Sequence, residues 1–173
     1  MLKDFPQFVP QKVCLSCDGC CRFKEATSIW RPKITREEIT QKKSSLVEKI
    51  FSKQAIDSRG RLKTVIKSGV CQCTFFNLDD NTCRIYDNRP FECQLYPFLL
   101  NKRGKEVVVS VHLMCPHVQE KRSAPQFENY VVALKQFFQK RDIRDFLRRH
   151  PGLATDYSDY DEELEDIFIL DIY

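Results

Sequence analysis

Apolar residues repeat at helical spacing in two stretches of the chain. In the first, Thr35 and Glu38 fit an N-terminal capping box, and we expect a helix from there to about residue 51. In the second, residues 125–149, an apolar stripe runs through one helix and continues, after a basic interval, in another. The apolar positions are Ile39, Leu46, Val47, Ile50 and Phe51, then Phe127, Tyr130, Val131, Leu134, Phe137, Phe138, Ile143, Phe146 and Leu147. The sequence Pro151–Gly152 ends the second stretch.

Shorter apolar segments between these helices predict strands. Residues 61–67 form a weak candidate and residues 70–78 a better one, after which three turn residues, 79–81, reverse the chain. Further on, residues 98–100 and 106–111 bracket a glycine-containing turn, which predicts a hairpin.

Three other segments complete the expected fold. Residues 1–13, with two prolines, predict an irregular arm, residues 89–97 predict one or two helical turns, and the final residues IFILDIY predict a strand. The fold class expected from all segments is α+β. We expect a small irregular domain in which short strands and cysteine-bearing loops converge on one metal site, with helices packed around them.

Length and charge indicate one domain with a distinct C-terminal segment. At 173 residues the chain has the size of a single domain and can bury a core without disulfides. Residues 156–173 carry eight acids and no Lys or Arg, whereas the rest of the chain has 28 basic and 16 acidic residues, a net charge of +12. We therefore expect a cysteine-cluster domain at residues 1–155 and an acidic tail at residues 156–173. A protein partner could bind the basic body or the tail.

The termini and cysteine content indicate a cytoplasmic protein. The N-terminal residues lack the apolar core of a signal peptide, and no stretch has the ~20 apolar residues of a membrane span. Nine cysteines are many for a reducing compartment, where clustered cysteines more often bind metal than form disulfides.

The first cysteine cluster is Cys14-x2-Cys17-x2-Cys20-Cys21. Two residues between thiolates let one turn aim both sulfurs at a single point, and thiolates favour zinc, copper(I) or iron–sulfur clusters. Cys20 and Cys21 are adjacent and tend to point apart, so an iron–sulfur cluster or two neighbouring metals would suit them better than a single ion.

The remaining cysteines are spread over a longer segment, at Cys71, Cys73, Cys83, Cys93 and Cys115. Cys71 would share a strand face with Cys73, and a buried core cysteine accounts for it equally well.

The segments CLSCDGCC, CTFF and CRIYDNRPFECQLYPF resemble the CxxCxxCC cysteine-cluster family, described as a zinc- or iron-chelating domain. That family includes YkgJ-type proteins, and flagellin lysine N-methylase carries a related pattern. The resemblance covers roughly residues 14–117 and implies eight metal ligands, which are Cys14, Cys17, Cys20, Cys21, Cys73, Cys83, Cys93 and Cys115. A methylase activity is not expected, because the glycine-rich strand–turn–helix that would bind S-adenosylmethionine is missing from the sequence.

Polar residues near the cysteines could support the site. Tyr86 and Arg89 could donate hydrogen bonds to thiolates and offset their charge, although Arg89 could equally pair with Asp87. His112 and His117 flank Cys115, and either could be a ligand or an ordinary core or surface histidine. The basic residues of 121–149 read as a solvated helix face or a dock for the tail, so we expect no nucleic-acid partner.

The sequence thus predicts a metal-binding protein with a cysteine-ligated iron–sulfur cluster that serves redox chemistry or electron transfer. The preference for iron–sulfur rests on the C-x2-C-x2-C run, which resembles the start of a ferredoxin motif. The alternative is a structural zinc module without catalytic activity, and a metal chelator or chaperone forms a third class. Whether the protein is an enzyme is left open by the sequence.

Overall fold

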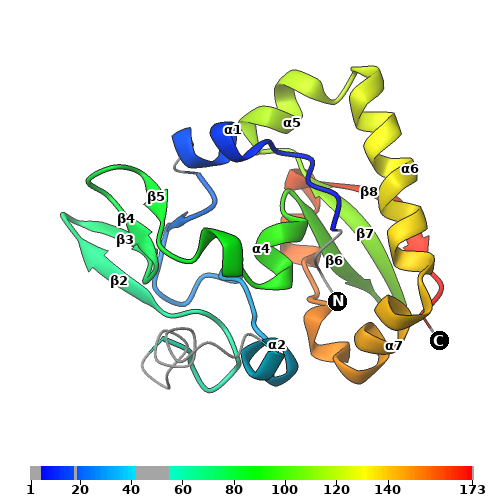
Figure 1. The fold of residues 1–173 in the computed structure, drawn as a ribbon, viewed down its shortest axis with the longest axis horizontal. Coiled ribbons are helices and arrows are strands. Elements are labelled where there is room, and N and C mark those ends of the chain that lie inside the picture. The colour runs from blue at the N-terminus through cyan, green and yellow to red at the C-terminus, as the bar shows by residue number, and fades with distance from the viewer. Residues whose placement is uncertain (1–4, 18, 42–54, 173) are drawn as a thin grey trace. The chain divides into compact units, whose positions relative to one another are not determined.

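The computed structural model describes residues 5–17, 19–41 and 55–172 (Figure 1). By its internal contacts the chain divides into two compact units. We call residues 10–94 the cysteine unit and residues 5–9 with 95–172 the helical unit. Short helices and small antiparallel sheets make up both, which confirms the predicted α+β class.

The cysteine unit is built from short elements. They are α1 (Gln11–Ser16), β1 (Arg22–Phe23), α2 (Arg36–Gln41), β2 (Thr64–Lys67), β3 (Val70–Cys73), β4 (Phe76–Asn77), β5 (Thr82–Cys83), the 3-10 turn η1 (Tyr86–Asn88) and α4 (Phe91–Leu95), whose last residue already belongs to the helical unit. The strand order β1-β3-β2 gives one antiparallel sheet, and β4 and β5 form a hairpin. Asn81 turns that hairpin with a positive φ of 53°, which asparagine tolerates.

The predicted capping box at the start of α2 is confirmed. The Thr35 backbone N–H donates to Glu38 Oε2 at 2.8 Å, and the Glu38 N–H donates to Thr35 Oγ1 at 3.1 Å. The later apolar positions expected for this helix, residues 46–51, lie outside the described residues.

Two expectations for the cysteine unit need correction. Residues 11–13 are not part of an irregular arm, because the N–H groups of Val13 and Cys14 both donate to the Pro10 carbonyl and start α1 there. The predicted strand 70–78 is interrupted: β3 ends at Cys73, and the chain after Thr74 forms β4, which pairs with β5 in a different sheet.

The core of the cysteine unit already contains cysteines. Its buried members are Ile34, Ala55, Leu62, Cys73, Phe75, Phe76 and Ile85, and partly buried Cys21 and Cys83 pack against them. Cys73 therefore lies in the apolar core and Cys21 and Cys83 lie against it, so packing restricts the positions of the side chains around these three thiols.

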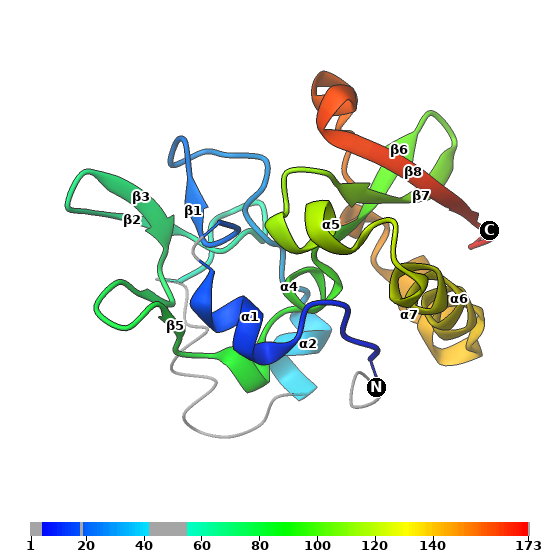
Figure 2. The same ribbon diagram turned by 90° about the horizontal axis from the view of Figure 1, so that it is seen from above.

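The helical unit has a sheet with helices packed on it. Its elements are β6 (Phe98–Arg103), β7 (Glu106–His112), α5 (Pro116–Lys121), α6 (Pro125–Gln139), α7 (Arg141–Arg149), the 3-10 turns η2 (Pro151–Leu153) and η3 (Ser158–Glu163), and β8 (Leu164–Leu170). β7 lies between β6 and β8 (Figure 1), and both pairs are antiparallel. Figure 2 shows the same strands from above. Aromatic contacts join α6 to both outer strands: Phe127 stacks on Phe98 of β6, and Phe138 meets Phe168 of β8 edge-on.

The predicted hairpin and the two C-terminal helices are confirmed. The hairpin strands reach Arg103, and Gly104 takes the positive φ of 62° that the tight turn requires. The strand expected at the C-terminus begins earlier, at Leu164, and the acids near it form ion pairs within the unit, such as Arg122 with Glu165 and Arg103 with Asp166. The division at residue 155 stays a prediction. Among the described helices, none has the length and apolar character of a membrane span.

Candidate functional site

All nine cysteines lie among the described residues, and all are free thiols. Eight belong to the cysteine unit, and Cys115, which is buried before the first turn of α5, belongs to the helical unit. The cysteine unit by itself therefore holds seven of the eight predicted ligands together with Cys71.

Local structure places these seven thiols on five short segments. Cys14 lies on α1, and Cys17 ends that helix with its N–H donating to the Cys14 carbonyl at 3.3 Å. Cys20 and Cys21 follow in the turn before β1, where the Cys21 carbonyl accepts the N–H of Cys73 at 2.8 Å. Cys73 ends β3, Cys83 ends β5 and Cys93 lies in the middle of α4.

Neighbouring thiols influence the ionisation of six of the seven. Burial raises the pKa of Cys14 to about 11, with further increases from the charges of Cys20, Cys83 and Cys17. Burial also raises the pKa of Cys73 to about 12, and Cys83 and Cys20 add to that increase. For Cys93, burial followed by Cys73, Cys20 and Cys83 raises the pKa well above its ordinary value. A group of thiols in this state favours a bound cation, which would offset the cost of ionising them.

The adjacent cysteines form a hydrogen-bonded pair. The Cys21 thiol donates to the Cys20 sulfur, which lowers the pKa of Cys20 and raises that of Cys21. Of the nine cysteines only Cys20 is exposed at the surface. Although adjacent side chains tend to point apart, this turn leaves the two thiols near enough to affect each other's pKa.

Arg89 brings a positive charge to the thiols. Its Nη1 donates to Cys14 Sγ at 3.8 Å, its Nε donates to the Tyr86 carbonyl at 2.9 Å, and its guanidinium lies 3.7 Å from the centre of the Tyr86 ring. The charge of Arg89 lowers the pKa of Cys14, Cys20, Cys83 and Cys93, against the larger effect of burial. Tyr86 therefore orients a cation that acts on the thiols.

Cys71 has a different environment from the seven. It is buried on β3, where its direct cross-strand neighbours are Phe23 and Ile66. These apolar neighbours agree with its interpretation as a core cysteine.

The histidines beside Cys115 have contacts within the helical unit. His112 Nδ1 lies 3.1 Å from the Tyr96 hydroxyl, and its Nε2 lies 3.2 Å from Glu163 Oε2. The ring of His117 packs edge-on against Phe8. Both ring nitrogens of His112 thus have hydrogen-bond partners, and the ligand roles considered for these histidines stay predictions.

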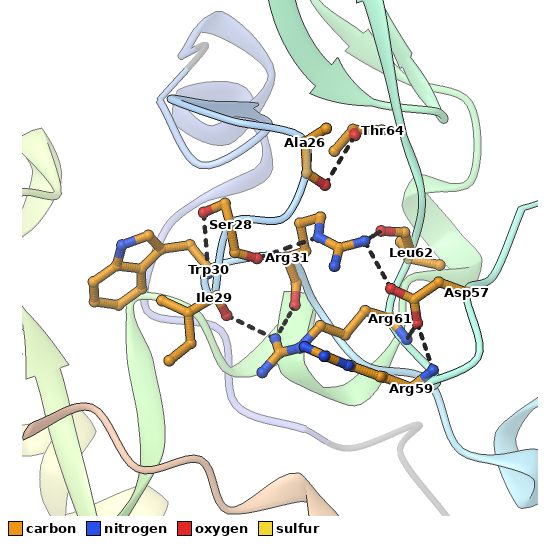
Figure 3. A network of polar contacts seen from close by, with 10 residues as sticks. All are labelled: Ala26, Ser28, Ile29, Trp30, Arg31, Asp57, Arg59, Arg61, Leu62 and Thr64. Atoms are coloured by element: carbon orange, nitrogen blue, oxygen red, sulfur yellow. Dashed lines mark hydrogen bonds and ion pairs between the residues drawn. The ribbon is translucent and has the colours of Figure 1, made fainter. Parts of the chain in front are cut away.

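A buried polar network that sequence reasoning missed braces the cysteine unit (Figure 3). Arg31 Nη1 donates to Asp57 Oδ2 at 2.8 Å, and the N–H groups of Arg59 and Arg61 donate to Asp57 Oδ1. Arg61 also donates to the carbonyls of Ile29 and Arg31. These bonds tie residues 28–31 to residues 57–62, and no spacing rule in the sequence pairs those two segments.

The donor chemistry fits a thiophilic metal, although the sulfurs do not converge on one point. Among the residues that the structure describes, no group of three or more Cys, His, Asp or Glu side chains is arranged to hold a metal ion. The thiols are nonetheless soft donors that lie in one unit. The charge of Arg89 stabilises the thiolate form of several of them. The arrangement therefore offers a set of soft thiol ligands, which must lose their protons to bind a metal.

Comparison with known proteins agrees with this donor set. No solved structure matches the chain. A family model named CxxCxxCC, with the description "Putative zinc- or iron-chelating domain", matches residues 13–126, two thirds of the chain, and includes the seven thiols and Cys115. This match supports metal binding by the cysteine cluster, and the chain belongs to the CxxCxxCC family.

Proposed function

We propose that the cysteine unit binds an iron–sulfur cluster and that the protein serves redox chemistry or electron transfer. The observation that carries this proposal is the gathering of seven free family cysteines in one compact unit, where Arg89 donates to Cys14 Sγ. Seven thiols exceed the four that one tetrahedral zinc ion takes, whereas a cluster or a pair of metals offers more positions. The proposed ligands within this unit are Cys14, Cys17, Cys20, Cys21, Cys73, Cys83 and Cys93.

The residues of this chain would prepare the site in two ways. Burial beside the apolar core holds Cys73 with Cys21 and Cys83, and Arg89 stabilises thiolate charge at Cys14. When bound, an iron–sulfur cluster would supply one-electron chemistry. Since the sulfurs are not yet convergent, loading would move them toward a common centre.

A structural zinc site is the second candidate. The family description names zinc as well as iron, and four thiolates of this set would satisfy one zinc ion. Zinc does not change oxidation state, so the protein would then present a stabilised surface to a partner.

One preparation distinguishes the candidates. The protein is purified anaerobically, and its visible spectrum is recorded with its iron, acid-labile sulfide and zinc content. Stoichiometric iron and sulfide with a visible absorption that dithionite bleaches would support the cluster. A colourless protein with one or two zinc ions would refute it in favour of the structural site.

Two cysteines on one strand provide a matched pair of variants. Cys71 and Cys73 are both buried on β3, and only Cys73 is a proposed ligand. Cys73→Ser should lower the metal content, and Cys71→Ser should leave it near that of the unaltered protein. Equal losses in both variants would show that general disruption of β3, not loss of a ligand, is being measured.

A further inference from the structure

A buried carboxylate and a partly buried one connect residues 33–41, which include α2, with α4 within the cysteine unit. Glu38 of α2 is 2% exposed, and its Oε1 accepts the backbone N–H of Phe91, the first residue of α4, at 2.6 Å. In the reverse direction, Glu92 Oε2 accepts the backbone N–H of Lys33 at 2.6 Å. Each segment thus supplies a carboxylate to a backbone donor of the other.

The bond from Phe91 to Glu38 satisfies a donor that α4 cannot satisfy itself. The first N–H groups of a helix have no intrahelical acceptor, and burying such a group without a partner is costly. Phe91 is fully buried, so water is a poor substitute for the carboxylate. A helix as short as α4 has few internal hydrogen bonds, and its position depends strongly on contacts of this kind.

The fixed helix carries one of the proposed ligands. Cys93 is two residues after Phe91, so on a helix its side chain projects from nearly the opposite side. Burial and the charges of Cys73, Cys20 and Cys83 raise its pKa, which agrees with a position near those thiols. Any rotation or fraying of α4 would change where the Cys93 sulfur lies.

Glu38 itself is rigidly held. Its Oε2 accepts the backbone N–H of Thr35 at 2.8 Å and the Thr35 hydroxyl at 3.0 Å, and its own N–H donates to Thr35 Oγ1. The capping box recognised in the sequence therefore has a second role: it presents the free oxygen of the same carboxylate to α4.

We propose that Glu38 is a positioning residue for the metal site, because it fixes the start of α4 and thereby directs the Cys93 thiol toward the other cysteines. The inference rests on the proposed ligand role of Cys93. It predicts that the carboxylate influences metal binding although none of its atoms would touch the metal.

The test uses the full chain and three variants. Glu38→Met removes every acceptor at similar volume, and Glu38→Gln is the milder change if the first variant does not fold. Thr40→Val removes an exposed hydroxyl of α2, which donates to the Arg36 and Glu37 carbonyls, and leaves the bonds of Glu38 in place, so it controls for damage to α2. The probes are Zn²⁺ alone, titrated against a chelator, and Co²⁺, whose thiolate charge-transfer absorption reports the number of sulfur ligands.

A buried hydrogen bond to a carboxyl group is strong enough that its loss should weaken Zn²⁺ binding by about tenfold or more. We expect that loss in the Glu38 variants, together with lower Co²⁺ charge-transfer intensity, and near-normal values in Thr40→Val. Unchanged Zn²⁺ affinity and Co²⁺ absorption in a folded Glu38 variant would overturn the inference.

Measurements on the metal-free protein separate this inference from the proposed function. Alkylation of each cysteine, followed by mass spectrometry, should be faster at Cys93 in the Glu38 variants and unchanged at Cys71. If the unaltered protein binds no metal, the proposed function fails, while faster alkylation at Cys93 still supports the positioning role. Equal alkylation of Cys93 in variant and unaltered protein would refute that role.

Discussion

Replacing Arg89 with methionine should raise the pKa of Cys14 and slow its reaction with alkylating agents. Arg89 donates to Cys14 Sγ at 3.8 Å, and its charge lowers the pKa of that thiol, of Cys20, of Cys83 and of Cys93. Methionine keeps much of the volume beside Tyr86 and removes the charge. The Cys14 thiolate would then lose a nearby cation.

The size of the effect follows from the distance. Two unit charges 3.8 Å apart interact by roughly 4 kcal/mol at an effective dielectric constant of about 20. Both side chains are partly exposed, so solvent reduces this to about 1–2 kcal/mol, or about one pKa unit. Because the Cys14 pKa is already about 11, the thiolate fraction near pH 8 should fall about tenfold.

The assay is the rate of iodoacetamide alkylation of each cysteine in the metal-free protein, measured by mass spectrometry across a pH series. Arg89→Lys keeps the charge and should retain most of the Cys14 reactivity. Arg84→Met is a second control, since Arg84 acts on Cys83 and should leave Cys14 unaffected. If Arg89→Met and the unaltered protein alkylate at the same rate at Cys14, the guanidinium does not stabilise that thiolate and its proposed role is wrong.

Three further outcomes test other parts of the structure. Burial raises the pKa of Asp57, but hydrogen bonds from Arg61, Arg59 and Arg31 outweigh it and leave the pKa below its ordinary value. The ionised carboxylate therefore stabilises the fold above about pH 4, and this stability should be lost on acidification. In urea titrations at pH 3–7, Asp57→Asn should be about 1–3 kcal/mol less stable at pH 7, and its stability should change less between pH 3 and pH 7. Leu134→Ala, at a fully buried position of α6, should cost about 2–5 kcal/mol in the same titrations, whereas Val132→Ala, at an exposed position, should cost little. Zinc affinity measured by chelator competition should rise about tenfold per pH unit for each proton displaced, because thiols with raised pKa values must ionise to bind.

Features set by neighbouring residues were predictable from the sequence. The capping box of Thr35 and Glu38 depends on residues three apart, and the hairpin turn at Gly104 depends on one backbone angle. The C-terminal helices followed from apolar spacing, because the sheet of the helical unit buries one face of α6. Such signals are local, so they can be read before the fold is known.

Contacts between distant segments were not predictable. The bond from Phe91 to Glu38 joins residues 53 positions apart, and the ion pair of Arg31 with Asp57 joins residues 26 apart. No periodicity links such partners, since each is decided by how the strands and loops pack. The spacing of the cysteines predicted which of them belong to the metal site. The contact between Arg89 and Cys14 was not predictable, because it depends on how residues 86–89 turn back toward α1.

The charge balance of the cysteine unit explains why metal binding and local folding should be linked. One guanidinium at Cys14 cannot offset several buried thiolates, so at neutral pH thiols such as Cys14 and Cys73 keep their protons. A multivalent ion can displace those protons, and by drawing Cys14 and Cys93 to one centre it would close a loop that contains nearly the whole unit. The entropic cost of closing a loop grows slowly with the length of the loop. Ligands at both ends of the unit would therefore restrict the whole unit at a free-energy cost only slightly above that of closing a short loop. The same ion would therefore complete the site and stabilise the short helices and strands that carry it, which have few internal hydrogen bonds of their own.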